Sequence, residues 1–368
     1  MKVKSQIIGM EPYKPGKPME EVKRELGLKE VHKLASNENP YGASPKAKAA
    51  VQQAVLYPEI YPDGYAADIR QAVADHIGVK ASQLLFGAGS DEVILMLCRA
   101  MLNNETNTVM ASPTFSQYKH NAVIEGAEIR EVPLKDGVHD LEGMLEQIDE
   151  NTRIVWVCNP NNPTGTYVND EAFQAFMRQV PENVLVVSDE AYIEYVTAQD
   201  YPNTLAYLNE YPNLMILRTF SKAYGLASMR IGYGVAQEKL VQSLDPVRPP
   251  FNTNTIAQYA AIAALGDEEY IEECRIKNRK ELDRLERYCE KKGLSYLPSQ
   301  TNFMLIQTGV SGDVMFDALL KKGFIIRSGE ALGYPDWIRV TAGTSEQNTC
   351  FLQALEECLD EQKHSVKG

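Results

Sequence analysis

Cysteine and histidine are scarce in this chain, and neither residue type forms a metal-binding or disulfide pattern. The five histidines include no HExxH spacing, and the cysteines include no CxxC pair. We therefore expect no metal site, and we expect the reduced, packed thiols of a cytoplasmic protein. The cysteines are Cys98, Cys158, Cys274, Cys289, Cys350 and Cys358.

The chain also lacks a long hydrophobic run and an excess of positive charge. No stretch approaches the roughly 18 uninterrupted apolar residues of a membrane span, and the first residues lack the apolar core of a signal peptide. The net charge of −13 argues against general binding to nucleic acid or to an anionic membrane surface. Any anionic ligand must therefore meet local positive charge, so individual arginines are informative.

Short apolar runs alternate with helical segments through the middle of the chain. The runs are residues 84–86, 108–111, 129–132, 154–158, 184–188, 214–217 and 231–235. Strand–helix alternation is typical of βαβ units, which build a mostly parallel, buried sheet. The sequence therefore predicts an α/β fold, with a large domain whose mostly parallel seven-stranded sheet is flanked by helices.

At 368 residues, the chain is long enough for two domains. We expect an N-terminal arm over residues 1–34, the large domain over 35–245 and a smaller α+β C-terminal domain over 246–368. In the small domain, the pattern predicts a long amphipathic helix at about 267–292 and strands at 301–308, 324–328 and 337–343. Thr344 and Gln347 predict a capping box at the start of the last helix.

Polar, glycine-rich or aromatic segments follow five of the predicted strands. They are GAGSDE, SPTFSQY, NPNNPTG, DEAY and RTFSK, in chain order. In open α/β sheets, ligands bind at the edge formed by the carboxyl ends of the strands. The sequence therefore predicts a binding site at this edge.

Lys222 is the candidate centre of that site, because it lies just past the predicted strand 214–217. Thr219 and Ser221 flank it, and Arg230 follows. An amine beside hydroxyls and a guanidinium suits a carbonyl cofactor that carries a phosphate, and nearby positive charge lowers the pKa of the amine. From this segment alone, a solvated surface lysine remains the alternative.

Asp189 follows another buried strand, where a carboxylate is costly unless a cation pairs with it. A protonated pyridine nitrogen is such a cation, although Asp189 could instead cap the next helix. Tyr192 and Asn162 could hydrogen-bond the phenolic oxygen of such a ring, since two prolines and a glycine fix the loop around Asn162. Phe115 could stack on the ring or serve as a core aromatic.

Three further features concern anions and nucleotides. GAGSDE opens a helix and could bring backbone N–H groups to a phosphate, but Glu92 stands where a dinucleotide fingerprint needs glycine. Tyr61 is either a packing residue or a phosphate ligand. Arg327 and Arg339 lie on consecutive predicted strands and repel each other unless an anion or surface salt bridges compensate.

Taken together, GAGSDE, SPTFSQY, NPNNPTG, SDEAY and FSKAYGLASMR resemble the pyridoxal-phosphate aminotransferases of the aspartate aminotransferase fold, fold type I of the pyridoxal-phosphate-dependent transferases. Within this family, LASNENPYG, YPDGY, PFNTN and IIRSGEALGYPDWIRVTAGT resemble the subgroup that acts on histidinol phosphate. The resemblance covers nearly the whole chain.

The resemblance implies pyridoxal 5'-phosphate as the cofactor and a catalytic set of Lys222, Asp189 and Tyr192. Lys222 would form the Schiff base and move the substrate proton, Asp189 would pair with the pyridine nitrogen, and Tyr192 would hold the phenolic oxygen. The cofactor would also be bound by Ser90, Asp91, Phe115, Asn162, Thr219, Ser221 and Arg230, with Tyr61 from a second subunit. The substrate would be bound by Arg327, Arg339, Asn162 and, in the arm, Tyr13. The family often has tyrosine at the position of Phe115, so the hydroxyl of that tyrosine is missing here.

The function that the resemblance implies is transamination of L-histidinol phosphate with 2-oxoglutarate, giving imidazole-acetol phosphate and glutamate, in a cytoplasmic homodimer of histidine biosynthesis. Two alternatives on the same fold stay open: an aromatic amino-acid aminotransferase and a phosphate-recognising decarboxylase. From other classes, a non-catalytic ligand-binding or regulatory protein and a nucleotide-dependent dehydrogenase are the alternatives. Glu92 weakens the dehydrogenase, and the acidic charge balance weakens DNA-binding regulation.

Overall fold

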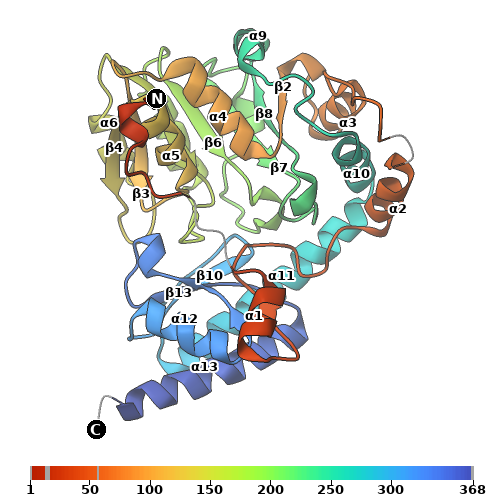
Figure 1. The fold of residues 1–368 in the computed structure, drawn as a ribbon. Helices are drawn as coiled ribbons and strands as arrows, with labels where there is room; N and C mark the ends of the chain where they lie inside the picture. Colours follow the sequence, from red (N-terminus) through yellow and green to blue (C-terminus); the bar gives the residue numbers. More distant parts are fainter. Residues whose placement is uncertain (1, 13–16, 56–57, 366–368) are drawn as a thin grey trace.

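A seven-stranded sheet lies at the centre of the larger part of the molecule (Figure 1). The structure, a computed structural model, describes residues 2–12, 17–55 and 58–365. The strand order is β2-β8-β7-β6-β5-β3-β4; only β8 runs antiparallel to its neighbours. The strands are β2 (Leu84–Gly87), β3 (Asn107–Ser112), β4 (Glu128–Pro133), β5 (Thr152–Cys158), β6 (Leu185–Asp189), β7 (Leu214–Thr219) and β8 (Gly232–Ala236).

This sheet confirms the predicted α/β class, and each predicted apolar run matches a strand to within two residues at either end. Helices cover both faces of the sheet, so successive strand residues enter two different cores. In β5, Ile154 and Trp156 pack into one core, while Val155 and Val157 pack into the other.

One face is covered by α4 (Ser90–Met101), α5 (Gln117–Glu125) and α9 (Glu238–Leu244), whose apolar residues join the core of Trp156. The other core takes residues from the remaining helices of the larger part. These are α2 (Pro45–Ala54), α3 (Ala67–Ile77), α6 (Leu141–Glu146), α7 (Asp170–Met177), α8 (Thr204–Tyr207) and α10 (Thr255–Leu265).

A four-stranded antiparallel sheet, in the order β12-β13-β10-β9, forms the smaller part below (Figure 1). Its strands are β9 (Tyr296–Leu297), β10 (Phe303–Gln307), β12 (Arg327–Ser328) and β13 (Trp337–Thr341). The core of this part is completed by α11 (Glu268–Lys292), α12 (Gly312–Lys321) and α13 (Ser345–Ser365). The predicted capping box is present, because Thr344 and Gln347 exchange side-chain-to-backbone hydrogen bonds of 2.9 and 3.3 Å.

The predicted single strand 324–328 is wrong, because this run forms two short strands in different sheets. β11 (Phe324–Ile325) pairs in parallel with β1 (His32–Lys33), whereas β12 pairs with β13. The chain changes partner at Ile326, whose side chain is buried in the core of the smaller part. The switch places Arg327 beside Arg339 and ties the N-terminal region, which also contains α1 (Met19–Leu26), to the smaller part.

The predicted division of the chain at residues 34 and 245 stays a prediction. The packing of α10 bears on the second boundary. This helix contacts α2 and α3 and contributes four buried alanines to the core of the larger part. Residues 255–265 are therefore associated with the seven-stranded sheet. None of the helices described combines the length and the apolarity that a membrane crossing requires.

Candidate active site

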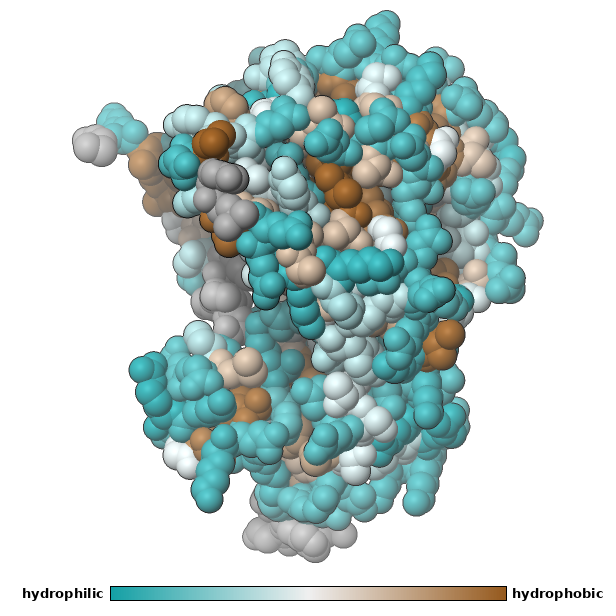
Figure 2. Space-filling model, turned by 90° about the vertical axis from the view of Figure 1, so that its right-hand side faces the viewer, coloured by the Kyte–Doolittle hydropathy of each residue, from teal (hydrophilic) through white to brown (hydrophobic). Residues whose placement is uncertain are grey.

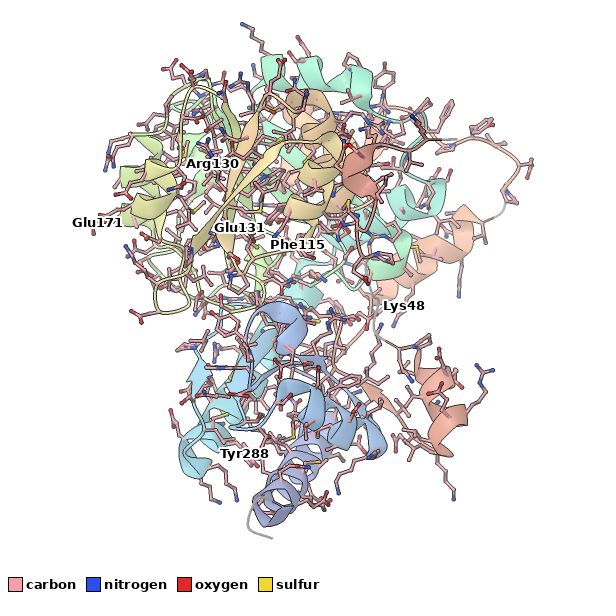
Figure 3. The ribbon with its side chains drawn as sticks, turned by 60° about the vertical axis from the view of Figure 1, so that its left-hand side comes forward. Lys48, Phe115, Arg130, Glu131, Glu171 and Tyr288 are labelled. Atoms are coloured by element: carbon pink, nitrogen blue, oxygen red, sulfur yellow. The ribbon has the colours of Figure 1, made fainter. Side chains whose placement is uncertain are left out.

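A cavity of about 850 Å³ lies at the carboxyl edge of the seven-stranded sheet, where it faces the smaller part. Its walls come from the segments after β2, β3, β5, β6 and β7 and from β12 and β13. In Figure 3, Phe115 lies on the side of the larger part that faces the smaller one. The edge that the sequence predicted for ligand binding thus has a cavity of cofactor size.

The structure brings most of the predicted site residues together around this cavity. Those that line it are Ser90, Asp91, Phe115, Asn162, Asp189, Tyr192, Thr219, Ser221, Lys222, Arg230, Arg327 and Arg339. Tyr61 does not line it: the residue is 78% exposed and its ring stacks on Phe251 at 4.8 Å. Its role as a ligand from a second subunit stays a prediction. Tyr13 lies outside the described residues.

Lys222 follows β7, and its amine projects into the cavity. Its Nζ donates to the backbone carbonyl of Ser36 at 3.3 Å and lies 5.7 Å from the ring centroid of Tyr192. The side chain keeps some exposure to the cavity, yet its burial, followed by the positive charge of Arg339, lowers the pKa of the amine to about 8. A neutral, nucleophilic amine is therefore accessible at mildly alkaline pH.

Asp189 ends β6, and its carboxylate is only 3% exposed. Burial raises its pKa to about 6, while a 2.6 Å hydrogen bond from the hydroxyl of Tyr118 opposes that shift. The ring of Tyr118 is itself held by stacking on Trp156, with centroids 4.7 Å apart. A buried acid oriented by such a donor suits a cationic partner in the cavity better than the helix-cap alternative, since no α-helix begins immediately after Asp189.

A cluster of hydrogen-bond donors lies where α4 begins. Gly89 precedes the helix with a φ of +82°, and a Cβ at this position would lie 2.6 Å from Nη2 of Arg230. Arg230 donates to the hydroxyl of Ser221 at 3.2 Å and contacts the carboxylate of Asp91 at 3.2 Å. The backbone N–H of Ser221 donates to the hydroxyl of Thr219 at 3.1 Å. Hydroxyls, a guanidinium and a helix N-terminus form a donor set that fits a phosphate.

Two arginines of the smaller part that line the cavity directly oppose each other. Arg327 and Arg339 are register partners in the antiparallel pair β12–β13, so their side chains share one face of the sheet. Arg339 donates to Oδ1 of Asn162 at 2.5 Å and to the carbonyl of Ala35 at 2.8 Å. Like charges at facing positions are stabilised by an anion between them, which suits an acidic substrate.

Two contributions escape the sequence reasoning. Tyr118 stands three positions after Phe115, but the sequence gives it no partner, and it gives none to Ser36 or Asn37 either. Asn37 is 2% exposed, has a φ of 56°, and donates from Nδ2 to the hydroxyl of Tyr192 at 3.0 Å. The asparagine is a weak signal, because this residue type tolerates the left-handed region.

The donor set as a whole fits a phosphorylated aromatic aldehyde with a ring nitrogen. The cavity offers an amine, a buried acid, a flat ring at Phe115, two donors for a phenolic oxygen and, at the start of α4, the donors that fit a phosphate. Across the described side chains of residues 2–12, 17–55 and 58–362, no cluster of three or more His, Cys, Asp or Glu could hold a metal ion.

Comparisons with known proteins agree with this chemistry. The family model described as "Aminotransferase class I and II" matches residues 29–355. A histidinol-phosphate aminotransferase of Halalkalibacterium halodurans is 64% identical over 362 residues, which cover 98% of each chain. One from Geobacillus thermodenitrificans is 59% identical over 363 residues, which cover 99% of this chain and 100% of the relative. The crystal structure of the Sinorhizobium meliloti histidinol-phosphate aminotransferase in complex with pyridoxal-5'-phosphate superposes with a TM-score of 0.90 at 30% identity, covering 98% of each chain.

Proposed function

The chain belongs to the class I and II aminotransferase family, and on this premise we propose that it transfers the amino group of L-histidinol phosphate to 2-oxoglutarate. The products are imidazole-acetol phosphate and glutamate, and the reaction is a step of histidine biosynthesis. The cofactor is pyridoxal 5'-phosphate. The named relatives do not favour the aromatic aminotransferase or decarboxylase alternatives.

One observation supports an anionic, phosphorylated substrate. Arg327 and Arg339 face each other beside a cavity that also contains the amine of Lys222. Two guanidinium groups can hold a phosphate in the first half-reaction and the carboxylates of 2-oxoglutarate or glutamate in the second. A single pair of arginines thus serves both substrates.

Four side chains hold the cofactor ring. Bound pyridoxal phosphate supplies an electron sink for negative charge that develops at the substrate Cα. Asp189 pairs its buried carboxylate with the ring nitrogen and keeps that nitrogen protonated. Asn162 and Tyr192 hold the phenolic oxygen, and Phe115 covers one face of the ring. Ser90, Asp91, Thr219, Ser221 and Arg230 form the phosphate site.

Lys222 moves the proton. Because its pKa is lowered to about 8, a substantial fraction of the amine is neutral near that pH and can accept the proton from the substrate Cα as a general base. The carbonyl of Ser36 keeps the amine inside the cavity while it is protonated. The protonated Nζ of Lys222 then acts as the general acid that gives this proton back.

We also propose a cytoplasmic homodimer. The six cysteines are all free thiols, which suits a reducing compartment. Ile60, Tyr61, Tyr65 and Phe251 are exposed near α3 and α10, and Figure 2 shows hydrophobic residues exposed among hydrophilic ones on this side. Such a patch suits a subunit interface that carries Tyr61 into the neighbouring cavity.

Subunit mixing tests the dimer proposal. If Tyr61 acts across the interface, mixing the impaired variants Tyr61→Ala and Lys222→Ala should create heterodimers with one intact site and restore activity to about a quarter of wild type, by random assortment of subunits. If no activity returns although subunits exchange, Tyr61 does not reach across.

A half-reaction titration of the purified holoenzyme tests the proposed function. L-Histidinol phosphate without 2-oxoglutarate should convert the bound cofactor to its amino form, seen by absorbance, and release one imidazole-acetol phosphate per site. Adding 2-oxoglutarate should reverse the spectrum, and Lys222→Ala should abolish the conversion. Reaction with phenylalanine or threonine phosphate but not with histidinol phosphate would contradict the proposal.

A further inference from the structure

The segment of residues 35–37 runs between the two parts of the molecule at the cavity wall, and each of its backbone carbonyls accepts a side-chain hydrogen bond. Ala35 accepts from Arg339 at 2.8 Å, Ser36 from Lys222 at 3.3 Å and Asn37 from Asn302 at 3.0 Å. Asn37 lines the cavity and is 2% exposed. The three hydrogen bonds hold the backbone around Asn37 in place, and this backbone fixes the point from which its side chain projects.

The hydrogen bonds around Asn37 determine which way its amide points. Its backbone N–H can only donate, and the hydroxyl oxygen of Thr341 accepts that bond at 3.0 Å. The hydroxyl proton of Thr341 then goes to Oδ1 of Asn37, also at 3.0 Å. With Oδ1 fixed in this way, Nδ2 must face Tyr192, to whose hydroxyl oxygen it donates at 3.0 Å.

This amide orientation dictates what the hydroxyl of Tyr192 does. Since Asn37 donates to that oxygen, the O–H proton of Tyr192 cannot be given to Asn37 and must go to another acceptor. Tyr192 is 3% exposed and lines the cavity. An oxygen atom of a molecule bound in the cavity can therefore accept the O–H proton of Tyr192.

We propose that Asn37, oriented by Thr341, is a positioning residue that directs the hydroxyl proton of Tyr192 to the phenolic oxygen of the bound cofactor. This inference rests on the proposed function, because that function supplies the phenolic oxygen. Thr341 belongs to β13, the strand that carries Arg339. The strand that binds the substrate anion therefore also determines the direction in which the hydroxyl of Tyr192 donates its hydrogen bond.

The absorbance of the bound cofactor depends on where the hydroxyl of Tyr192 donates its proton. A donor at the phenolic oxygen stabilises negative charge there, so losing the donor raises the pH at which the cofactor bound to Lys222 loses its proton and changes its absorbance. The charged groups that act on Lys222 are Arg339, Asp91, Glu38 and Arg230, and all four remain in every variant proposed below.

The test compares Asn37→Asp, Tyr192→Phe and the charge-neutral double variant Tyr192→Phe/Thr341→Val as holoenzymes. An aspartate carboxylate can only accept, so it should take the Tyr192 proton away from the cofactor. We expect each single variant to raise the pH midpoint of the absorbance change by about one unit. If Asn37 acts through Tyr192, the double variant should shift no further than Tyr192→Phe alone.

A neutral pair of variants separates orientation from added charge. Thr341→Val removes the hydroxyl that fixes the amide, so the midpoint should rise by about half a unit, while Thr341→Ser should keep the wild-type midpoint. Thermal unfolding of each cofactor-free variant, together with its cofactor affinity from fluorescence quenching, verifies that the fold and site are retained.

Two results would overturn the inference: additive shifts in the double variant, or a wild-type midpoint in Thr341→Val. A wild-type holoenzyme without any pH-dependent band, or with one that survives in Lys222→Ala, would instead count against the proposed function itself.

Discussion

Asp189, which is buried, and Lys222, which is half-buried, are ionisable side chains of one cavity, and burial moves their pKa values toward each other. It raises the pKa of the carboxyl to about 6 and lowers that of the amine to about 8. In both cases burial disfavours the charged form. Their surroundings therefore prepare an acid that needs a cationic partner and an amine that can be neutral at the working pH.

Asp189 makes the stability of the cofactor-free protein depend on pH. Its folded pKa of about 6 lies above the ordinary 3.8, so its stabilising contribution is complete below about pH 4 and is lost as the pH rises through 6. Asp189→Asn lacks this loss. Relative to wild type, the free energy of unfolding of the variant should therefore gain about 2 to 3 kcal/mol between pH 4 and 7, measured by urea denaturation. A difference that does not change with pH would rule this out.

Tyr118→Phe removes the hydroxyl that donates to Asp189 and leaves the stacking ring in place. A hydrogen bond to a buried charge is worth about 1.5 to 3 kcal/mol, so cofactor affinity and the half-reaction rate should each fall by about tenfold or more. Fluorescence quenching and stopped-flow absorbance measure the two. Tyr167→Phe, which removes a 2.7 Å bond to Asp200 elsewhere, should change neither. Equal effects of the two variants would contradict the role of Tyr118.

The site residues that could be predicted from the sequence are those whose position follows from the end of a strand. Lys222 and Asp189 come directly after apolar runs, so the topology alone places them at one edge. Tyr118 and Asn37 could not be given partners in this way. Their hydrogen bonds span 71 and 155 positions of the chain, and such pairs depend on tertiary packing, which the local sequence does not specify.

Among the elements, the start of α4 illustrates how a turn forms a binding site. Gly89 combines a positive φ with close approach to Arg230. Gly89→Ala should strain the backbone and displace the guanidinium, raising the dissociation constant of the cofactor by about tenfold or more. Equilibrium binding to the cofactor-free protein measures this.

Gly78 offers the matched control for this prediction. It ends α3 with a φ of +73°, and a Cβ added there would meet no atom within 4 Å, so Gly78→Ala adds backbone strain without a clash. The variant should lose stability but keep its cofactor affinity. Equal loss of affinity in both variants would mean that strain alone, rather than displacement of Arg230, weakens the site.

Element types and order were predictable because apolar runs and capping residues are local signals. The run FIIRS was an exception, since Phe324 and Ile325 pair with His32 and Lys33; the two-residue strands β1 and β9 were not predicted either. The pattern of apolar and polar residues within a five-residue run cannot reveal that its first half pairs in one sheet and its second half in another. The choice depends on the distant segment 32–33, whose own pattern is too short to predict a strand.

At the scale of the whole molecule, an ion pair fixes the neighbouring strands behind the site. Glu190, with no exposed side-chain surface, follows β6 and pairs with Arg218 of β7 at 2.8 Å. Glu190→Gln leaves the guanidinium without its buried counter-charge and should lower the free energy of unfolding by about 3 to 5 kcal/mol. Chemical denaturation of the cofactor-free protein measures this.

The exposed pair of Lys80 and Glu238, also at 2.8 Å, provides the control. Glu238→Gln should change stability by no more than about 0.5 to 1 kcal/mol, because water already solvates both charges. Similar losses in the two variants would show that burial does not govern the first effect.

The layered architecture of the molecule could be predicted from the strand–helix alternation. Which helices pack on the seven-stranded sheet, and which surface is available to a second subunit, could not. The alanines of α10 pack with the larger part although they follow the predicted boundary at 245, because a helix face of small residues carries no signal for its partner. The exposed aromatic patch around Tyr61 is likewise a property of folded surfaces rather than of local sequence.

The most direct test of the central claim is reduction of the holoenzyme with borohydride, followed by peptide mapping. Reduction fixes the cofactor to the amine with which it has condensed. We expect one label per chain, on Lys222, and none in Lys222→Ala. A label on another lysine, or no label on a fully loaded enzyme, would contradict it.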